Sequence, residues 1–138
     1  MYNRNMDGEK RKILIVDDDS FLLDMYALKF SQNNFDVYTA DNGVSAIQKL
    51  KEGLKPDILL MDIIMPEMDG FEMLEKINSG KLSEDSVKVF LSNKGQQVDI
   101  DQGNSLGASG YIVKANSTPA EVIDQVIEIW AKKVVNKK

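Results

Sequence analysis

The chain has 138 residues, of which 43% are hydrophobic and 28% charged, and its formal net charge is -5. This length fits one domain around one core, and the composition is typical of a globular protein. The acidic balance disfavours direct binding to nucleic acid, which exploits a basic field. Because histidine and cysteine are both absent, thiolate nucleophiles, histidine bases and typical zinc sites are excluded.

The first twelve residues, MYNRNMDGEKRK, are polar and contain no apolar segment of the kind that forms a signal peptide. No apolar run approaches the length needed to span a bilayer. We therefore expect a cytoplasmic protein that has no contact with a membrane. Its expected organisation is a flexible segment at residues 1–11, a folded domain at 12–131 and a basic tail at 132–138.

Short apolar runs alternate with longer amphipathic segments along the chain. The pattern predicts strands at residues 12–17, 35–40, 57–61, 87–91 and 110–113, and helices at 21–31, 44–51, 70–78, 97–106 and 119–134. Alternating strands and helices of this kind favour an α/β fold, in which a doubly wound five-stranded parallel sheet carries helices on both faces.

Turn and cap residues support these boundaries. Asp41-Asn42-Gly43 is a turn sequence before the second helix, and Glu52-Gly53 ends that helix. Thr118-Pro119-Ala120-Glu121 has the form of a capping box with proline at the first helical position, so the last helix is expected to begin there.

Acidic residues follow the first and third predicted strands. Asp17 and Asp18 follow the run ILIV, and Asp62 follows the run ILLM. If these strands are neighbours, the three carboxylates converge at one edge of the sheet and repel each other unless a cation lies between them. Mg²⁺ suits such a site because it prefers oxygen ligands. The alternative for any single acid is a helix cap or a solvent-exposed residue, and Asp19 is interpreted in that way, with Ser20 as a candidate cap.

Asp62 is also a candidate nucleophile. A carboxylate can attack phosphorus when a metal and a lysine neutralise the transferring oxygens. Lys114 ends the fifth strand and Ser92 ends the fourth, so an ammonium and a hydroxyl could both reach a phosphoryl group at this edge. Alone, Lys114 is equally well interpreted as a solvated lysine on an edge strand, and Ser92 as an ordinary turn residue.

Together these motifs resemble the receiver domain of two-component response regulators, of the stand-alone, CheY-like type. The resemblance rests on DD after the first strand, D-x-x-M-P-x-M-D-G from Asp62, a hydroxyl residue after the fourth strand and GASGYIVK at the fifth. It extends over roughly residues 12–131, with the motifs in the family's order. It implies the flavodoxin-like strand order 2-1-3-4-5, which fits the polar interruptions in the second and fifth strands.

The resemblance also implies roles for individual residues. Asp62 is implied as the phosphoacceptor, and Mg²⁺ as the cofactor, held by Asp17, Asp18, Asp62 and the backbone carbonyl of Ile64.

Three further residues are implied in switching. Ser92 matches the hydroxyl that turns toward the phosphoryl group, and Lys114 matches the lysine that pairs with it. Tyr111 matches the aromatic position that rotates inward when the hydroxyl moves.

Three positions depart from the family pattern. Ala115 follows Lys114 where relatives usually carry a proline with a cis peptide bond, and a non-proline cis bond is costly, so the placement of Lys114 is in doubt. Ile64 is apolar where some relatives have a polar side chain, which should alter the lifetime of the phosphoryl group. Asn93 follows the switch hydroxyl where a small residue is common, and it could restrict access of the phosphodonor.

The last two helices suggest an output surface. The fourth helix is polar and contains Gly103, which weakens it by up to ~1 kcal/mol relative to alanine. The last helix carries a wide apolar stripe formed by Val122, Ile123, Val126, Ile127, Ile129 and Trp130. Its width suggests a docking or dimer surface formed by the fourth helix, fifth strand and last helix, and the alternative is a deeply buried terminal helix.

We expect a phosphorylation-activated response regulator that is a switch and not an enzyme. Its expected partners are a sensor histidine kinase or phosphotransfer protein and a downstream protein target, with neither nucleic acid nor membrane bound directly. One alternative is a receiver-like module that binds its partner without phosphorylation. An aspartyl-phosphate hydrolase is disfavoured, because such enzymes commonly need a second aspartate two positions after the nucleophile, where Ile64 stands.

Overall fold

The computed structural model describes residues 10–136, and helices and strands alternate through them as predicted. In chain order the elements are β1 (Arg11–Val16), α1 (Ser20–Gln32), β2 (Phe35–Ala40), α2 (Gly43–Lys51), β3 (Ile58–Met61), α3 (Gly70–Ser79), β4 (Val87–Ser92), α4 (Gln97–Ser105), β5 (Gly110–Val113), a 3-10 helix (Lys114–Asn116) and α5 (Pro119–Asn136). Each boundary lies within two residues of its prediction. Most of the expected flexible N-terminal segment, and the end of the expected basic tail, lie outside the described residues.

The five strands form one parallel sheet in the order β2-β1-β3-β4-β5, which confirms the predicted topology. Val16 of β1 pairs with Met61 of β3, and Met61 pairs with Phe90 of β4, so the central strands reach the same edge together. β3 and β4 are buried along their whole length, whereas β2 and β5 are only partly buried. The partial exposure of the outer strands accommodates polar residues such as Asp36 and Thr39 in β2.

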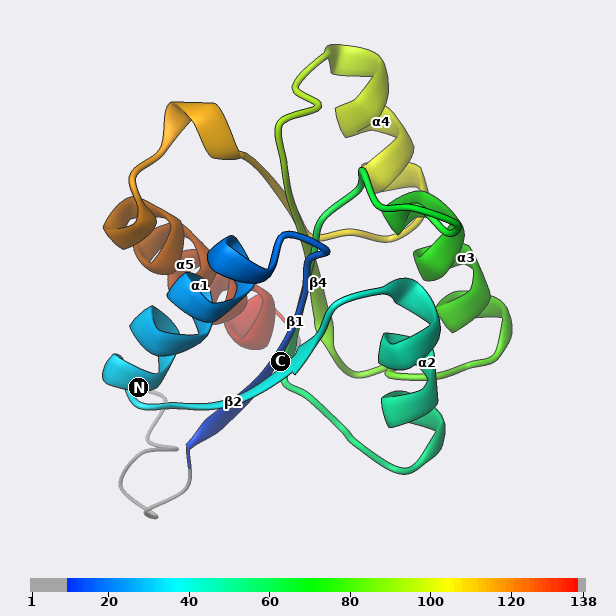
Figure 1. The fold of residues 1–138 in the computed structure, drawn as a ribbon, viewed down its shortest axis with the longest axis horizontal. Coiled ribbons are helices and arrows are strands. Elements are labelled where there is room, and N and C mark those ends of the chain that lie inside the picture. The colour runs from blue at the N-terminus through cyan, green and yellow to red at the C-terminus, as the bar shows by residue number, and fades with distance from the viewer. Residues whose placement is uncertain (1–9, 137–138) are drawn as a thin grey trace.

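Helices cover both faces of the sheet. Figure 1 shows α1 and α5 on one face and α2, α3 and α4 on the other. Side chains of β1 alternate between the two layers: Ile13 and Ile15 join the core that contains Phe30 of α1, and Leu14 joins the core that contains Leu74 of α3. β3 is apolar throughout, because both of its faces are covered.

Caps fix the helix starts near the sheet edge. Asp19 is the N-cap of α1, and its side chain accepts a hydrogen bond of 3.1 Å from the backbone N–H of Leu22. The predicted cap Ser20 is wrong by one position, because Asp19 has the extended backbone that a cap requires and Ser20 is already helical. Thr118 and Glu121 form the predicted capping box, with reciprocal bonds of 2.8 and 3.2 Å.

The long terminal helix α5 packs its apolar stripe inward. Val122, Ile123, Val126 and Trp130 are buried, and the other two stripe residues are partly buried against the same core. The width of the stripe is thus explained by packing against the sheet and α1, the alternative weighed above. Within residues 10–136, no helix combines the length and the apolar character needed to cross a bilayer.

Candidate functional site

Three carboxylates meet at the carboxyl edge of the central strands. Asp17 directly follows β1 and Asp62 directly follows β3, and the N–H of Asp62 still bonds to the carbonyl of Val16 at 2.9 Å. One carboxylate oxygen each from Asp17, Asp18 and Asp62 lies within 4.8 Å of the others. Asp17 and Asp62 are buried and Asp18 is exposed. The predicted convergence of these residues is therefore observed.

Backbone N–H groups orient the two buried carboxylates. Oδ1 of Asp17 accepts a bond of 2.9 Å from the N–H of Asp19 at the start of α1. Oδ1 of Asp62 accepts a bond of 2.7 Å from the N–H of Ile63. Because each Oδ1 atom is held by the chain that follows it, each Oδ2 atom is left for a partner inside the site.

That partner is Lys114. Its Nζ donates to Oδ2 of Asp17 at 2.8 Å and to Oδ2 of Asp62 at 3.1 Å. Lys114 begins the 3-10 helix after β5, and every peptide bond between residues 10 and 136 is trans. Ala115 therefore does not prevent the lysine from reaching the acidic cluster. This contact removes the reason for doubting the placement of Lys114.

Burial and charge compete in this cluster. Burial would lower the pKa of the Lys114 ammonium, but the hydrogen bond to Asp17 and the charge of Asp62 outweigh it, so the pKa lies above its usual value. Burial raises the pKa of the Asp17 carboxyl, and the Lys114 hydrogen bond offsets only part of that rise. The site thus holds an ion pair that has been largely withdrawn from water.

The donor set fits a hard divalent cation. All the converging atoms are carboxylate oxygens, which are the ligands that Mg²⁺ prefers. The ammonium of Lys114 already occupies the position of a cation against two of them. Since three carboxylates face one ammonium, formal charges leave two negative charges uncompensated. Asp18 is exposed, which gives an incoming ion access from solvent.

The two predicted switch residues both form hydrogen bonds with backbone atoms of Lys94. Ser92 ends β4 with 0% exposure, and its Oγ accepts a bond of 3.3 Å from the N–H of Lys94. The hydroxyl of Tyr111 donates to the backbone carbonyl of Lys94. The Tyr111 ring lies 6.0 Å from the ring of Phe90. One residue of the loop between β4 and α4 therefore links both predicted switch positions.

Lys94 was not foreseen from the sequence, because it acts through backbone atoms that any residue would supply. Gly70 was also missed as a site residue, although the DG pair of the motif contains it. A Cβ on Gly70 would lie 2.2 Å from the carbonyl oxygen of Asp62, so the first turn of α3 packs directly on the backbone of Asp62. Ile64 and Asn93, the two departures beside the site, are both exposed.

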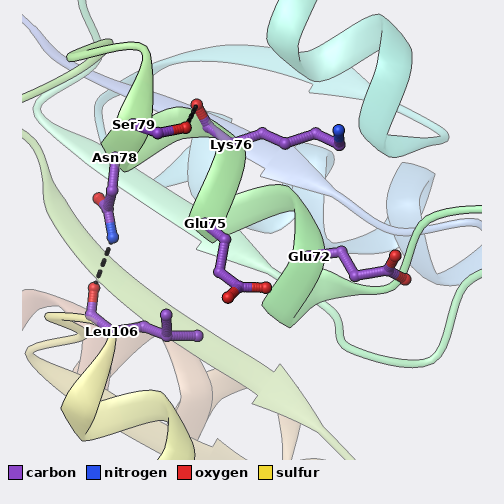
Figure 2. A pocket seen from close by; sticks show the side chains of 6 residues that line it. All are labelled: Glu72, Glu75, Lys76, Asn78, Ser79 and Leu106. Carbon is purple, nitrogen blue, oxygen red and sulfur yellow. Dashed lines mark hydrogen bonds between the residues drawn. The ribbon is translucent and has the colours of Figure 1, made fainter.

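One hollow in the described surface lies away from the carboxylate cluster. It measures about 680 Å³ and lies between α3 and the end of α4, where Asn78 donates a bond of 2.8 Å to the carbonyl of Leu106. Figure 2 shows its lining residues, which include Glu72 and Glu75 but none of the converging carboxylates. The carboxylate cluster therefore lies outside this hollow.

Known proteins share this arrangement of elements. A putative response regulator from Chloroflexus aurantiacus superposes with a TM-score of 0.79 at 28% identity, covering 89% of this chain and 99% of that one. The chemotaxis protein CheY of Listeria monocytogenes is 41% identical over 105 residues, which are 75% of this chain and 85% of that protein.

Longer regulators match as well. The transcriptional regulatory protein CpxR homolog of Haemophilus influenzae is 38% identical over 103 residues, 75% of this chain and 43% of that protein. The chain thus spans less than half the length of such transcriptional regulators. Residues 13–127 match the family of the response regulator receiver domain. With the fold, the strand-end carboxylates and these similarities in agreement, the chain belongs to the response regulator receiver domain family.

Proposed function

We propose that the domain is a phosphorylation-activated switch in which Asp62 accepts a phosphoryl group. The observation that carries the proposal is the pair of hydrogen bonds from Lys114 to Asp17 and Asp62 within one carboxylate cluster. In the transfer, a carboxylate oxygen of Asp62 forms a bond to phosphorus. The bond from phosphorus to the donor's nitrogen or oxygen breaks, and its electron pair leaves with the donor.

The chain's own groups then stabilise the product. Lys114 pairs with a phosphoryl oxygen, because its ammonium already lies beside the carboxylate that becomes modified. Ser92 donates its hydroxyl to a second oxygen. Mg²⁺ held by Asp17, Asp18, Asp62 and the carbonyl of Ile64 would neutralise charge on the transferring oxygens. The same groups would assist hydrolysis of the aspartyl phosphate, so the domain acts on its own residue and turns over no separate substrate.

The response to phosphorylation is proposed to pass through Lys94. When Ser92 turns toward the phosphoryl group, it releases the N–H of Lys94, and the loop that also holds the hydroxyl of Tyr111 must rearrange. α4 follows that loop directly. The phosphorylated state is thus selected by a partner that binds the altered α4 surface.

The proposed partners follow from this chemistry. The phosphoryl group would come from the phosphohistidine of a sensor kinase or of a phosphotransfer protein, in the cytoplasm. A downstream protein would read the altered surface. Dimerisation through α4, β5 and α5 stays a prediction, as does the absence of direct contact with nucleic acid.

The test is incubation with acetyl phosphate and Mg²⁺, followed by intact-mass measurement. The wild type should gain one labile phosphoryl mass, and Asp62→Ala should gain none. Asp24→Ala is the matched control, because Asp24 is an exposed carboxylate on α1 outside the cluster, and it should behave as the wild type. Chelation of Mg²⁺ should suppress the gain.

Failure of the wild type to gain mass from acetyl phosphate and from a histidine kinase would refute the proposal and favour a constitutive binding module. Equal phosphorylation of Asp62→Ala would show that another residue is the acceptor. Sustained release of phosphate from unrelated esters would indicate a hydrolase.

A further inference from the structure

The two ends of α4 are attached to the rest of the domain in different ways. Residues 93–98, which form the loop before the helix and its first two positions, are all exposed. The ion pair between Lys94 and Asp99 at this end has an exposed lysine and contributes little to stability. The amino-terminal end of α4 is therefore held loosely.

The carboxyl-terminal end of α4 is joined to its surroundings at several points. Leu106 and Ala108, which follow the helix, pack against the core on this face of the sheet. Gly107 between them has φ 94°, a left-handed conformation that glycine adopts without strain and that commonly ends helices. The N–H of Ser109 then donates to the carbonyl of Lys88 in β4 at 2.7 Å. The chain thus passes directly from the end of α4 into the sheet.

A side chain of α3 adds a further contact at the same end. Nδ2 of Asn78 donates a hydrogen bond of 2.8 Å to the carbonyl oxygen of Leu106, across 28 residues of sequence, and Figure 2 shows this bond bridging the two segments. The last carbonyls of a helix have no donor within the helix, so the amide of Asn78 supplies one from outside. Asn78 is itself well placed, because Leu74 and Ile77 beside it in α3 are both 0% exposed. The bond therefore ties the end of α4 to a firmly packed helix.

The proposed switch acts on the opposite end of α4. When Ser92 releases the N–H of Lys94, the disturbance enters through the exposed loop that leads into the helix. A helix that is pushed at a loosely held end and retained at the other turns about the retained end, because packed elements move as rigid bodies. The displacement should therefore be largest near Lys94 and smallest near Leu106.

We propose that Asn78 anchors the carboxyl-terminal end of α4, so that phosphorylation of Asp62 displaces only the amino-terminal end of the helix. The inference rests on the proposed function and deepens it, because it names the part of α4 that changes. A downstream partner that distinguishes the two states would then contact the first turn of the helix, where Val98 is 68% exposed, and not its last turn.

Distances between spin labels test the displacement, and the absence of cysteine from the chain makes labelling specific. Asp24→Cys supplies an exposed reference label on α1, which lies on the opposite face of the sheet. Paired with it, Val98→Cys follows the amino-terminal end of α4 and Ser105→Cys follows the carboxyl-terminal end. Beryllofluoride, a stable mimic of the phosphoryl group, is added at saturating Mg²⁺. The distance to position 98 should change by about 2 Å or more, and the distance to position 105 by less than about 1 Å.

Asn78→Ala removes the anchor from the labelled proteins. In this variant the distance to position 105 should also change on addition of beryllofluoride, by a similar amount to the distance to position 98. Asn33→Ala is the matched control, because the Asn33 side chain donates an equivalent bond of 2.8 Å to the carbonyl of Lys29 at the end of α1. It should leave both distance changes as they are in the wild type. Both asparagines are exposed, so both variants should fold, which their unfolding midpoints check.

Three results would overturn the anchor and leave the phosphoacceptor proposal standing. Equal changes at both positions in the wild type would show that the whole helix moves. No change at either position, in a protein that binds beryllofluoride, would show that α4 does not respond. A position 105 that stays fixed in Asn78→Ala would show that Asn78 does not hold the helix. A wild type that fails to bind beryllofluoride, as measured by calorimetry, would overturn both proposals.

Discussion

Helices α3 and α4 cover the same face of the sheet beside the acidic cluster, but they are attached to it in different ways. α3 buries four apolar side chains, Phe71, Met73, Leu74 and Ile77, whereas the buried residues of α4 are Asp99 and Gly103. α3 is thus held by apolar burial, the larger contribution to stability, and α4 by polar contacts that exchange readily with water. An element attached in the second way can move at low cost.

The polar contacts that hold the start of α4 are weak. Lys94 forms an ion pair with Asp99 at 3.4 Å, and its side chain is 42% exposed, so the pair contributes little. Asp99 also accepts a bond of 3.3 Å from the N–H of Gln96 at the helix start. In α3, Asp69 and Glu72 form a reciprocal capping box with bonds of 2.8 and 3.2 Å. At this edge of the sheet, α3 is therefore held firmly, whereas α4 can shift.

The largest expected difference between the two helices comes from removing an apolar side chain from each. Leu74→Ala should lower the free energy of unfolding by about 2–5 kcal/mol, because Leu74 is 0% exposed and its loss leaves a cavity. Val98→Ala in α4 should change it by less than about 0.5 kcal/mol, because Val98 is 68% exposed. Urea denaturation of both variants measures the difference, and equal losses would refute the contrast.

A smaller effect is expected from adding a methyl group to each helix. Gly70→Ala should lower the free energy of unfolding by about 1–3 kcal/mol, because the new Cβ would overlap backbone atoms of Asp62 and Ile63 that cannot yield separately. Helix propensity alone predicts the opposite, a gain of about 1 kcal/mol. Denaturation midpoints decide between the two signs.

Gly103→Ala is the control in α4. There the Cβ would lie 3.1 Å from the ring of Phe90 and 3.4 Å from that of Tyr111, and side-chain rings can shift where backbone cannot. The packing cost and the gain in helix propensity should nearly cancel. A loss as large as that of Gly70→Ala would mean that α4 is as tightly fixed as α3.

The smallest expected effect concerns Tyr111, which ties the loop before α4 to β5. Tyr111→Phe removes one hydrogen bond, to the carbonyl of Lys94, and should cost about 1 kcal/mol at neutral pH. Burial and the charge of Asp99 raise the pKa of Tyr111 to about 12 in the folded protein, while the unfolded phenol titrates near ~10. The raised pKa favours folding below pH ~10, and this contribution is lost as the pH rises through 12.

Unfolding free energies of wild type and Tyr111→Phe, measured between pH 8 and 12, test this dependence. The difference between the two proteins should shrink across that interval. Parallel curves would show that the hydroxyl is not held by the folded structure.

The sequence predicted those features that follow from the regular spacing of apolar residues in strands and helices. Alternation of apolar runs and amphipathic segments located every strand and every α-helix, and the resemblance to receiver domains implied the strand order. The approach of Asp17 to Asp62 followed from that order, because residues that end neighbouring parallel strands must share an edge.

What could not be predicted depends on side-chain direction and on backbone atoms. The position of the Lys114 ammonium could not be predicted, because Ala115 replaces the proline that usually follows this lysine in the family. The 3-10 helix that begins at Lys114 brings the ammonium to the carboxylates without a cis peptide bond. The links through Lys94 use main-chain groups that leave no mark in the sequence.

The chain contains a single tryptophan, and its surroundings determine what optical experiments can detect. Trp130 is stacked on the guanidinium of Arg11 at 4.7 Å, and Arg11 also lies over the ring of Phe35. Arg11 begins β1 whereas Asp17 follows its end, which separates the indole from the acidic cluster by about 20 Å of strand. Intrinsic fluorescence should report loss of the whole fold faithfully and remain nearly constant while ions bind or α4 shifts, so a probe placed on α4 would be needed to follow those events.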